Sequence, residues 1–173
     1  MDDQILNKVA QSGIITIDLE EFYPPGERIL FDIKEFLFQE LILREKDFRQ
    51  AMKNQDWKSY TDKYVSLICS VDAIIPTWAY MLIVSYLEPY AKKIVFGDLE
   101  TLETVIYHEV LSHLSLEQYK DARIVIKGCG NLPVPTAAYV ELTKRLRPLA
   151  KSIMYGEPCS TVPIFKQNVH EIK

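Results

Sequence analysis

The chain has 173 residues, of which 48% are hydrophobic and 25% are charged. This composition is typical of a folded domain and excludes a disordered or fibrous protein. Its 20 Lys and Arg residues are outnumbered by 24 Asp and Glu, which gives a net charge of −4, so the chain lacks the general positive field that attracts nucleic acid.

The first third of the sequence predicts an α+β segment. Residues 2–11 carry apolar side chains at helical spacing and predict a short helix. Residues 14–18 alternate between β-branched and polar side chains, which predicts a strand. After Asp32, a candidate N-cap, residues 33–54 keep one apolar helical face and predict a helix. The apolar triplet at 41–43 is the alternative, a strand that breaks this helix.

From Lys63 onward, short apolar runs alternate with longer amphipathic ones, the pattern of βαβ units on a parallel sheet. This alternation predicts four strands and three crossover helices: strands at 64–69, 93–96, 123–126 and 152–155, and helices at 76–90, 98–114 and 135–147. The sequence indicates no internal repeat. We therefore predict a three-layer α/β fold with one mostly parallel sheet over residues 63–155, in a single α/β domain covering residues 1–173.

The sequence also indicates where the chain resides. Its first residues, MDDQILNKVAQSG, contain acids and no apolar stretch of signal-peptide length. The most apolar segment, residues 73–87, is too short and too polar to span a bilayer. We expect a cytoplasmic protein with no membrane partner and with three reduced cysteines.

The loops at the carboxyl ends of the predicted strands are the expected place for a ligand, because loops and helix N-termini converge there in open α/β sheets. All three cysteines fall in these loops, and we predict a metal site formed by Cys69, Asp72, Cys129 and Cys159. Thiolates select zinc, iron or an iron–sulfur cluster. Because the third and fourth strands are expected to be neighbours, Cys129 and Cys159 should approach each other. The alternatives are buried, inert cysteines or a single reactive thiol.

The turn after the third predicted strand begins like a dinucleotide-binding fingerprint, although Pro133 replaces its third glycine. We take this turn and an acidic residue after the fourth strand as candidate cofactor-binding residues: Gly128, Gly130, Asn131 and Glu157. In the alternative interpretation, glycine and proline form an ordinary turn.

Three further patterns have simpler explanations. His108 and His113 are five positions apart, whereas the zincin motif needs a spacing of four, so they cannot bind one ion from the same helix. A basic cluster near the end of the last predicted helix complements the helix dipole, with an anionic partner as the alternative: Lys144, Arg145, Arg147 and Lys151. The aromatic residues of helix 76–90 indicate a core or a dimer contact.

Segments throughout the chain resemble a small bacterial family of unknown function with this length: DLEEFYPPGER (18–28), KDFRQAMKNQDW (46–57), CSVDAIIPTWAYM (69–81), VFGDLETLE (95–103) and YGEPCSTVPIFK (155–166). The resemblance implies a genetic association with iron–sulfur cluster assembly. Iron–sulfur assembly proteins are therefore candidate partners.

Interpretations from different functional classes stay open. In the first, the protein binds a metal or an iron–sulfur cluster at the cysteine-lined site, or assists iron–sulfur or sulfur handling. In the second, it is a non-catalytic, homo-oligomeric interaction module, a homodimer through its aromatic apolar faces. In the third, it is a small-molecule enzyme without a metal, so whether the protein is an enzyme stays undecided.

Overall fold

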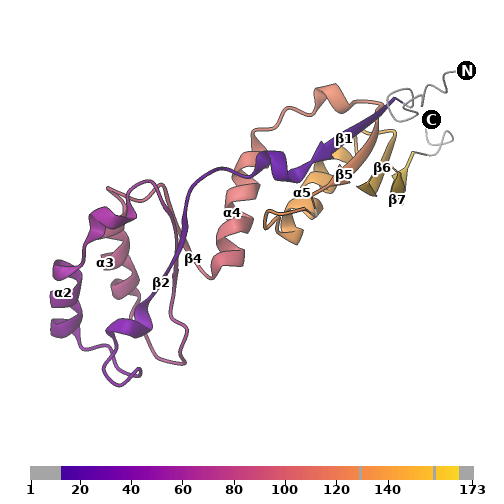
Figure 1. Ribbon diagram of the computed structural model, residues 1–173. Helices are drawn as coiled ribbons and strands as arrows, with labels where there is room; N and C mark the ends of the chain where they lie inside the picture. Colours follow the sequence, from indigo (N-terminus) through magenta and orange to yellow (C-terminus); the bar gives the residue numbers. More distant parts are fainter. Residues whose placement is uncertain (1–12, 129, 158, 168–173) are drawn as a thin grey trace, which may run out of the picture. The chain divides into compact units, whose positions relative to one another are not determined.

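The chain is divided between two sheets, each with its own core. A computed structural model describes residues 13–128, 130–157 and 159–167 (Figure 1). Unit 2 comprises Pro24–Val105, and unit 1 comprises the chain on either side of it. Helix α4 (Leu99–Ser112) contains the boundary, so its first half belongs to unit 2 and its second half to unit 1.

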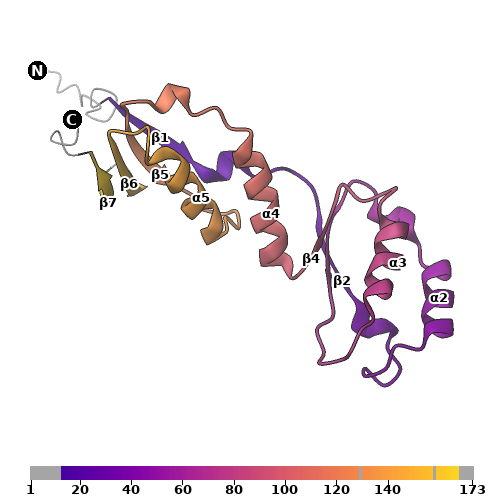
Figure 2. The ribbon, with the colours of Figure 1, turned by 180° about the vertical axis from the view of Figure 1, so that it is seen from behind.

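Unit 2 is built on a parallel sheet with strand order β2-β3-β4. Its elements, in chain order, are β2 (Arg28–Asp32), η2 (Ile33–Phe36), α2 (Glu45–Asn54), η3 (Trp57–Tyr60), β3 (Tyr64–Ile68), α3 (Thr77–Leu87) and β4 (Lys93–Phe96). Figure 1 and Figure 2 show α2 and α3 on the same side of this sheet. Right-handed crossovers between successive neighbours require that placement. The two helices and the strands enclose the core of unit 2: Phe31, Ile33, Phe48, Met52, Trp57, Val65, Leu67, Ala79, Ile83 and Leu87.

Unit 1 is built on a sheet with strand order β1-β5-β6-β7, in which only the β6–β7 pair is antiparallel. Its elements are β1 (Ile14–Asp18), η1 (Leu19–Phe22), the second half of α4, η4 (Glu117–Tyr119), β5 (Arg123–Lys127), α5 (Thr136–Leu146), β6 (Ser152–Glu157) and β7 (Ser160–Lys166). Buried residues from each of these elements except β7 form the core of unit 1, and Phe165 of β7 packs against it.

The α/β class, with mostly parallel strands joined by helical crossovers, is confirmed. The prediction of one sheet over residues 63–155 is wrong, because β3 and β4 belong to one sheet and β5 and β6 to the other. Strand β5 pairs instead with β1, in register from Ile14 opposite Arg123 to Asp18 opposite Lys127. The single domain over residues 1–173 stays a prediction. No helix in the described part of the chain is long and apolar enough to cross a membrane.

The first third differs from its prediction at the helix expected over residues 33–54, and strand β2 was not predicted from the sequence. Helix α2 starts at Glu45, and the preceding residues form a turn closed by a bridge between Phe38 and Ile42. Gln39 (φ 51°) and Glu40 (φ 57°) adopt the left-handed conformation, which a continuous helix cannot contain. The alternative of a break at 41–43 is therefore closer to the structure. The predicted helix at 2–11 lies outside the described residues.

The two units repeat the same order of elements, so the expectation of no internal repeat is wrong. Residues 62–98 align with residues 121–157 without a gap, and this alignment places β3, α3 and β4 on β5, α5 and β6. The same residue stands at both positions of many aligned pairs: Asp62/Asp121, Pro76/Pro135, Thr77/Thr136, Ala79/Ala138, Tyr80/Tyr139, Leu87/Leu146, Pro89/Pro148, Ala91/Ala150, Lys92/Lys151, Ile94/Ile153 and Gly97/Gly156.

Backbone hydrogen bonds repeat along with the residues. Asp62 (φ 60°) and Asp121 (φ 57°) both adopt the left-handed conformation. The amide of Asp62 donates to the carbonyl of Tyr90 at 3.0 Å, and the amide of Asp121 donates to the equivalent Leu149 at 2.9 Å. In each unit, this bond ties the turn that follows the second helix to the start of the central strand.

The cores also correspond, residue by residue. Every buried core residue of unit 2 has a buried core counterpart in unit 1: Phe31/Ile17, Ile33/Leu19, Phe48/Tyr107, Met52/Leu111, Trp57/Leu116, Val65/Ile124, Leu67/Ile126, Ala79/Ala138, Ile83/Leu142 and Leu87/Leu146. The chain is thus a nested duplication, in which unit 2 is inserted after the first strand and the 3-10 helix of unit 1.

Equivalent core positions should make similar contributions to stability. Leu87 and Leu146 are fully buried at the same position of α3 and α5. Leu87→Ala and Leu146→Ala are each expected to lower the free energy of unfolding by about 2–5 kcal/mol, since each removes buried methyl groups and leaves a cavity. Urea unfolding followed by far-UV circular dichroism measures this change. The control Ile74→Ala, at a side chain that is 95% exposed, should change stability by less than about 0.5 kcal/mol. A similarly small effect at Leu146 would contradict the assignment of the second core.

Candidate functional site

Two of the predicted metal ligands, Cys69 and Cys159, follow strands of different sheets. Cys69 is half-buried after β3 in unit 2, where its thiol lies 3.5 Å from the Val71 carbonyl oxygen, and Asp72 is exposed nearby in the same loop. Cys159 is exposed in the turn between β6 and β7 of unit 1. Because the two cysteines follow strands of different sheets, the argument for a common edge is lost. Cys129, and with it the predicted approach to Cys159, lies outside the described residues.

Among the residues that the structure describes, no three His, Cys, Asp or Glu side chains are grouped so that they could hold a metal ion. Binding of zinc, iron or an iron–sulfur cluster stays a prediction, and so does the partnership with iron–sulfur assembly proteins.

Asp32 links two segments at the carboxyl edge of the sheet in unit 2. The Asp32 carboxylate accepts hydrogen bonds from the backbone amides of Lys34 at 3.0 Å and Ser70 at 3.1 Å, and so joins the end of β2 to the loop that carries Cys69. Burial raises the pKa of Asp32, but the hydrogen bonds from Ser70 and Lys34 outweigh it, and the pKa lies below its usual value.

Unit 1 repeats this arrangement, and its aspartate forms an ion pair with a lysine of the neighbouring strand β5. Asp18, the equivalent of Asp32, accepts from the Glu20 amide at 3.0 Å and lies 3.0 Å from Lys127 Nζ. Glu157 Oε1 lies 3.9 Å from the same ammonium group. The hydrogen bond to Asp18, followed by the charges of Asp18 and Glu157, raises the pKa of Lys127. Glu157 therefore has a charge partner within its own sheet edge.

Two of the four predicted cofactor residues do line a groove. Gly128 and Gly130 contribute to an apolar groove of unit 1, whereas Asn131 and Glu157 do not. The Gly130 amide donates to the Glu20 carboxylate, so the turn is anchored to η1.

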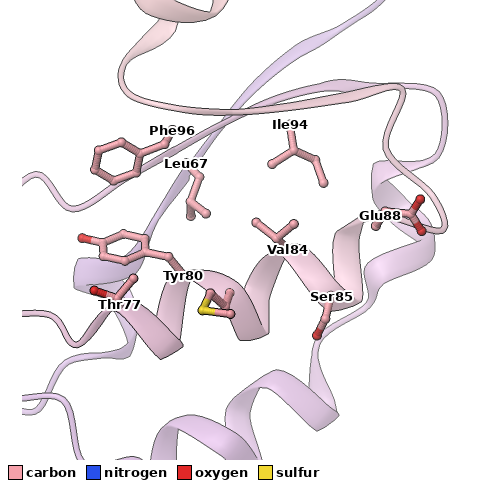
Figure 3. A pocket seen from close by; sticks show the side chains of 9 residues that line it. Leu67, Thr77, Tyr80, Val84, Ser85, Glu88, Ile94 and Phe96 are labelled. Atoms are coloured by element: carbon pink, nitrogen blue, oxygen red, sulfur yellow. The ribbon is translucent and has the colours of Figure 1, made fainter.

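Unit 2 contains an apolar groove between α3 and β4, which we call the α3 groove. It has a volume of about 790 Å³ and is lined by Leu67, Thr77, Tyr80, Met81, Val84, Ser85, Glu88, Ile94 and Phe96. Figure 3 shows the α3 side chains on one side and Leu67, Ile94 and Phe96 facing them. The rings of Tyr80 and Phe96 meet edge-to-face at 5.2 Å between centroids.

Unit 1 contains the equivalent α5 groove, with a volume of about 1040 Å³. Every position that lines the α3 groove has its counterpart here: Ile126, Thr136, Tyr139, Val140, Thr143, Lys144, Arg147, Ile153 and Tyr155. The edge-to-face pair also recurs, between Tyr139 and Tyr155 at 5.8 Å. The α5 groove is larger because further residues also line it: Gly128, Gly130, Leu132, Pro133 and Val134 after β5, and Ile164 and Phe165 of β7.

The outer edge distinguishes the two grooves. In unit 1, β7 pairs with β6 and covers that edge. In unit 2, β3 is the sole neighbour of β4 among the described strands. The side chains of Phe96 and Met81 are 69% and 67% exposed beside this edge. The sequence associated α3 with a core or a dimer contact but indicated neither groove, since both require knowledge of strand order.

A match to a family model shows the protein family of the chain. Residues 3–167 match the family described as "Protein of unknown function (DUF2480)". The chain belongs to this family. The match extends across both units, so the nested duplication lies within the region that defines the family. No curated protein and no solved structure matches the chain.

The carboxylate of Asp32 should make stability depend on pH. Because its pKa is lower in the folded chain than in the unfolded one, its contribution is complete above the unfolded value near 4 and is lost as the pH falls through the folded value. Asp32→Asn is expected to lower the free energy of unfolding by about 1–3 kcal/mol at pH 7 and by less at pH 3, below the unfolded pKa. Urea unfolding at both pH values measures the difference. Asp56→Asn, at a side chain that makes no capping hydrogen bond, is the control. An equal loss at both pH values for Asp32→Asn would contradict a role for the charge.

Proposed function

We propose that the protein is a non-catalytic interaction module, in which two copies of the chain pair through β4 and the α3 groove. One observation carries this proposal: equivalent edges of two equivalent units differ in that β7 covers one and no described strand covers the other. Unit 1 therefore shows how such an edge can be covered. Strand β7 pairs with it in antiparallel orientation, and the apolar side chains of β7 extend the groove.

The backbone of β4 is oriented for such pairing. The Gly97 amide donates to the Leu67 carbonyl at 3.0 Å, on the side of β3. Because hydrogen-bonding direction alternates along a strand, the amides of Ile94 and Phe96 point to the opposite side. A second strand about 4.8 Å away would accept these bonds.

Charge favours a second copy as the occupant. Strand β4 is preceded by Lys92 and begins with Lys93, and it is followed by Asp98 and Glu100. Hydrogen bonds from Thr101 lower the pKa of Asp98, which is therefore ionised at neutral pH. In a two-fold antiparallel pair, the basic start of one β4 lies opposite the acidic end of the other. The edge is thus complementary to itself.

The exposed apolar side chains complete the interface. Strand pairing would bring the α3 helices of the two copies alongside each other, with Met81, Val84 and Phe96 between them. Burying this apolar surface is favourable, and edge pairing removes an exposed strand edge that would otherwise template aggregation.

Met81→Lys tests the interface. It places two ammonium groups close to the two-fold axis, and we expect the dimer dissociation constant to rise at least about tenfold, equal to 1.4 kcal/mol. Sedimentation equilibrium across a concentration series measures this. Ile74→Lys, at an exposed apolar residue of unit 2 outside the groove, is the matched control and should leave the dimer intact. Phe96→Pro removes one outward-facing amide and should also weaken the dimer. A monomeric wild-type chain, or a dimer that Met81→Lys leaves unchanged, would overturn the proposal.

A further inference from the structure

The two grooves can be compared position by position, because each residue that lines the α3 groove has an equivalent in the α5 groove. The residues at one end of the groove differ in charge. Most of these positions keep their character, as in Leu67/Ile126, Tyr80/Tyr139, Ile94/Ile153 and Phe96/Tyr155. The changes gather over the last turns of the helix, where Val84, Ser85 and Glu88 correspond to Thr143, Lys144 and Arg147. One end of the groove changes from one acidic group to two cationic groups.

We infer that the α5 groove binds an amphipathic anion, a single-chain aliphatic carboxylate, with its alkyl chain in the groove and its carboxylate at Arg147 and Lys144. This site lies in unit 1 and is independent of the pairing of β4 in unit 2.

Arg147 is held in place and keeps its charge available. Its guanidinium group lies 3.7 Å from the centroid of the Phe165 ring, and this stacking fixes it at the rim of the groove. In the described part of the chain, no carboxylate forms an ion pair with Arg147, and Lys144 has the Glu141 carboxylate at 3.4 Å on the same helix. The planar guanidinium fork suits a carboxylate, to which it can donate two parallel hydrogen bonds.

The rest of the groove suits an alkyl chain. Beyond the cationic end, its walls are mostly aliphatic or aromatic, and several of these side chains are exposed: Leu132 (39%), Val140 (63%), Ile164 (52%) and Tyr155 (38%). The volume of about 1040 Å³ is at the upper end of the range for small-molecule sites. A ligand with an apolar chain and one anionic head group therefore matches this groove, which has apolar walls and a cationic end.

Calorimetric titration with decanoate tests this inference, with decanol as the uncharged probe of the same chain length. We expect the wild-type chain to bind decanoate at least tenfold more tightly than decanol. Arg147→Gln should weaken decanoate binding by about tenfold and leave decanol binding within twofold. Glu88→Gln, at the equivalent position of the α3 groove, is the matched control and should change neither. Far-UV circular dichroism shows whether each variant is folded.

The location is tested separately, by methyl NMR. Decanoate should shift the resonances of Val140 and Ile164, and leave Val84 of the α3 groove unchanged. Met81→Lys should bind decanoate like the wild-type chain even if it is a monomer, so the dimer and this site can fail independently. Equal binding of decanoate and decanol, an unchanged affinity in Arg147→Gln, or shifts confined to the α3 groove would each overturn the inference. In that case, Lys144 and Arg147 would only complement the dipole at the C-terminal end of α5.

Discussion

Parallel strands cannot be joined by a tight turn, and this constraint shapes both units. Each connection must cross over the sheet, and right-handed crossovers between successive neighbours put the helices on one face. The second helix, α3 or α5, therefore lies over the last parallel strand, β4 or β6. Beyond that strand, the sheet of unit 2 has no further described strand, whereas the sheet of unit 1 continues with β7. In both units the groove lies between the second helix and the last parallel strand, so its position follows from the topology.

The segment after the last parallel strand decides how each groove is used. In unit 1, the chain reverses after Glu157 and returns as β7, so that its own backbone completes the edge. In unit 2, the chain leaves β4 through Gly97 (φ 136°) and enters α4, so no such return occurs. A Cβ at Gly97 would lie 2.8 Å from Thr101, which explains why glycine is required at this exit. The same arrangement of strands and helices thus has an edge that β7 covers in unit 1 and an edge that no described strand covers in unit 2.

Local patterns predicted most elements but not their assembly. Strands β3 to β6 and helices α3 and α5 are found close to where periodicity placed them. The pairing of β1 with β5 joins residues that are far apart in the chain, and no local pattern reports it. Strand β7 was missed because Pro163 interrupts its pattern, which an edge strand tolerates.

The repeat is hard to detect in the sequence because its core keeps side-chain type rather than identity, as in Val65/Ile124 and Ile83/Leu142. Identical residues include positions where the backbone sets the requirement, Asp62/Asp121 and Gly97/Gly156, and two core pairs, Ala79/Ala138 and Leu87/Leu146. For the site, the rule that ligands lie beyond strand ends selected Gly128 and Gly130, and both residues line the α5 groove, while their binding of a cofactor stays a prediction. The same rule placed Cys69 and Cys159 on one edge because it assumed one sheet, whereas these two residues follow strands of different sheets.

The nesting of unit 2 within unit 1 has a consequence for how the chain folds as it leaves the ribosome. Strands β2, β3 and β4 emerge in succession, so the sheet of unit 2 can close as soon as β4 is synthesised. Strand β1 emerges before all of them, yet its partner β5 is not complete until Lys127. Throughout that interval β1 lacks its partner strand, and Ile17 lacks the core that later buries it. The first of the described strands is therefore paired only after the sheet of unit 2 can form, and the time for which it stays unpaired lengthens with every delay in translation between η1 and β5.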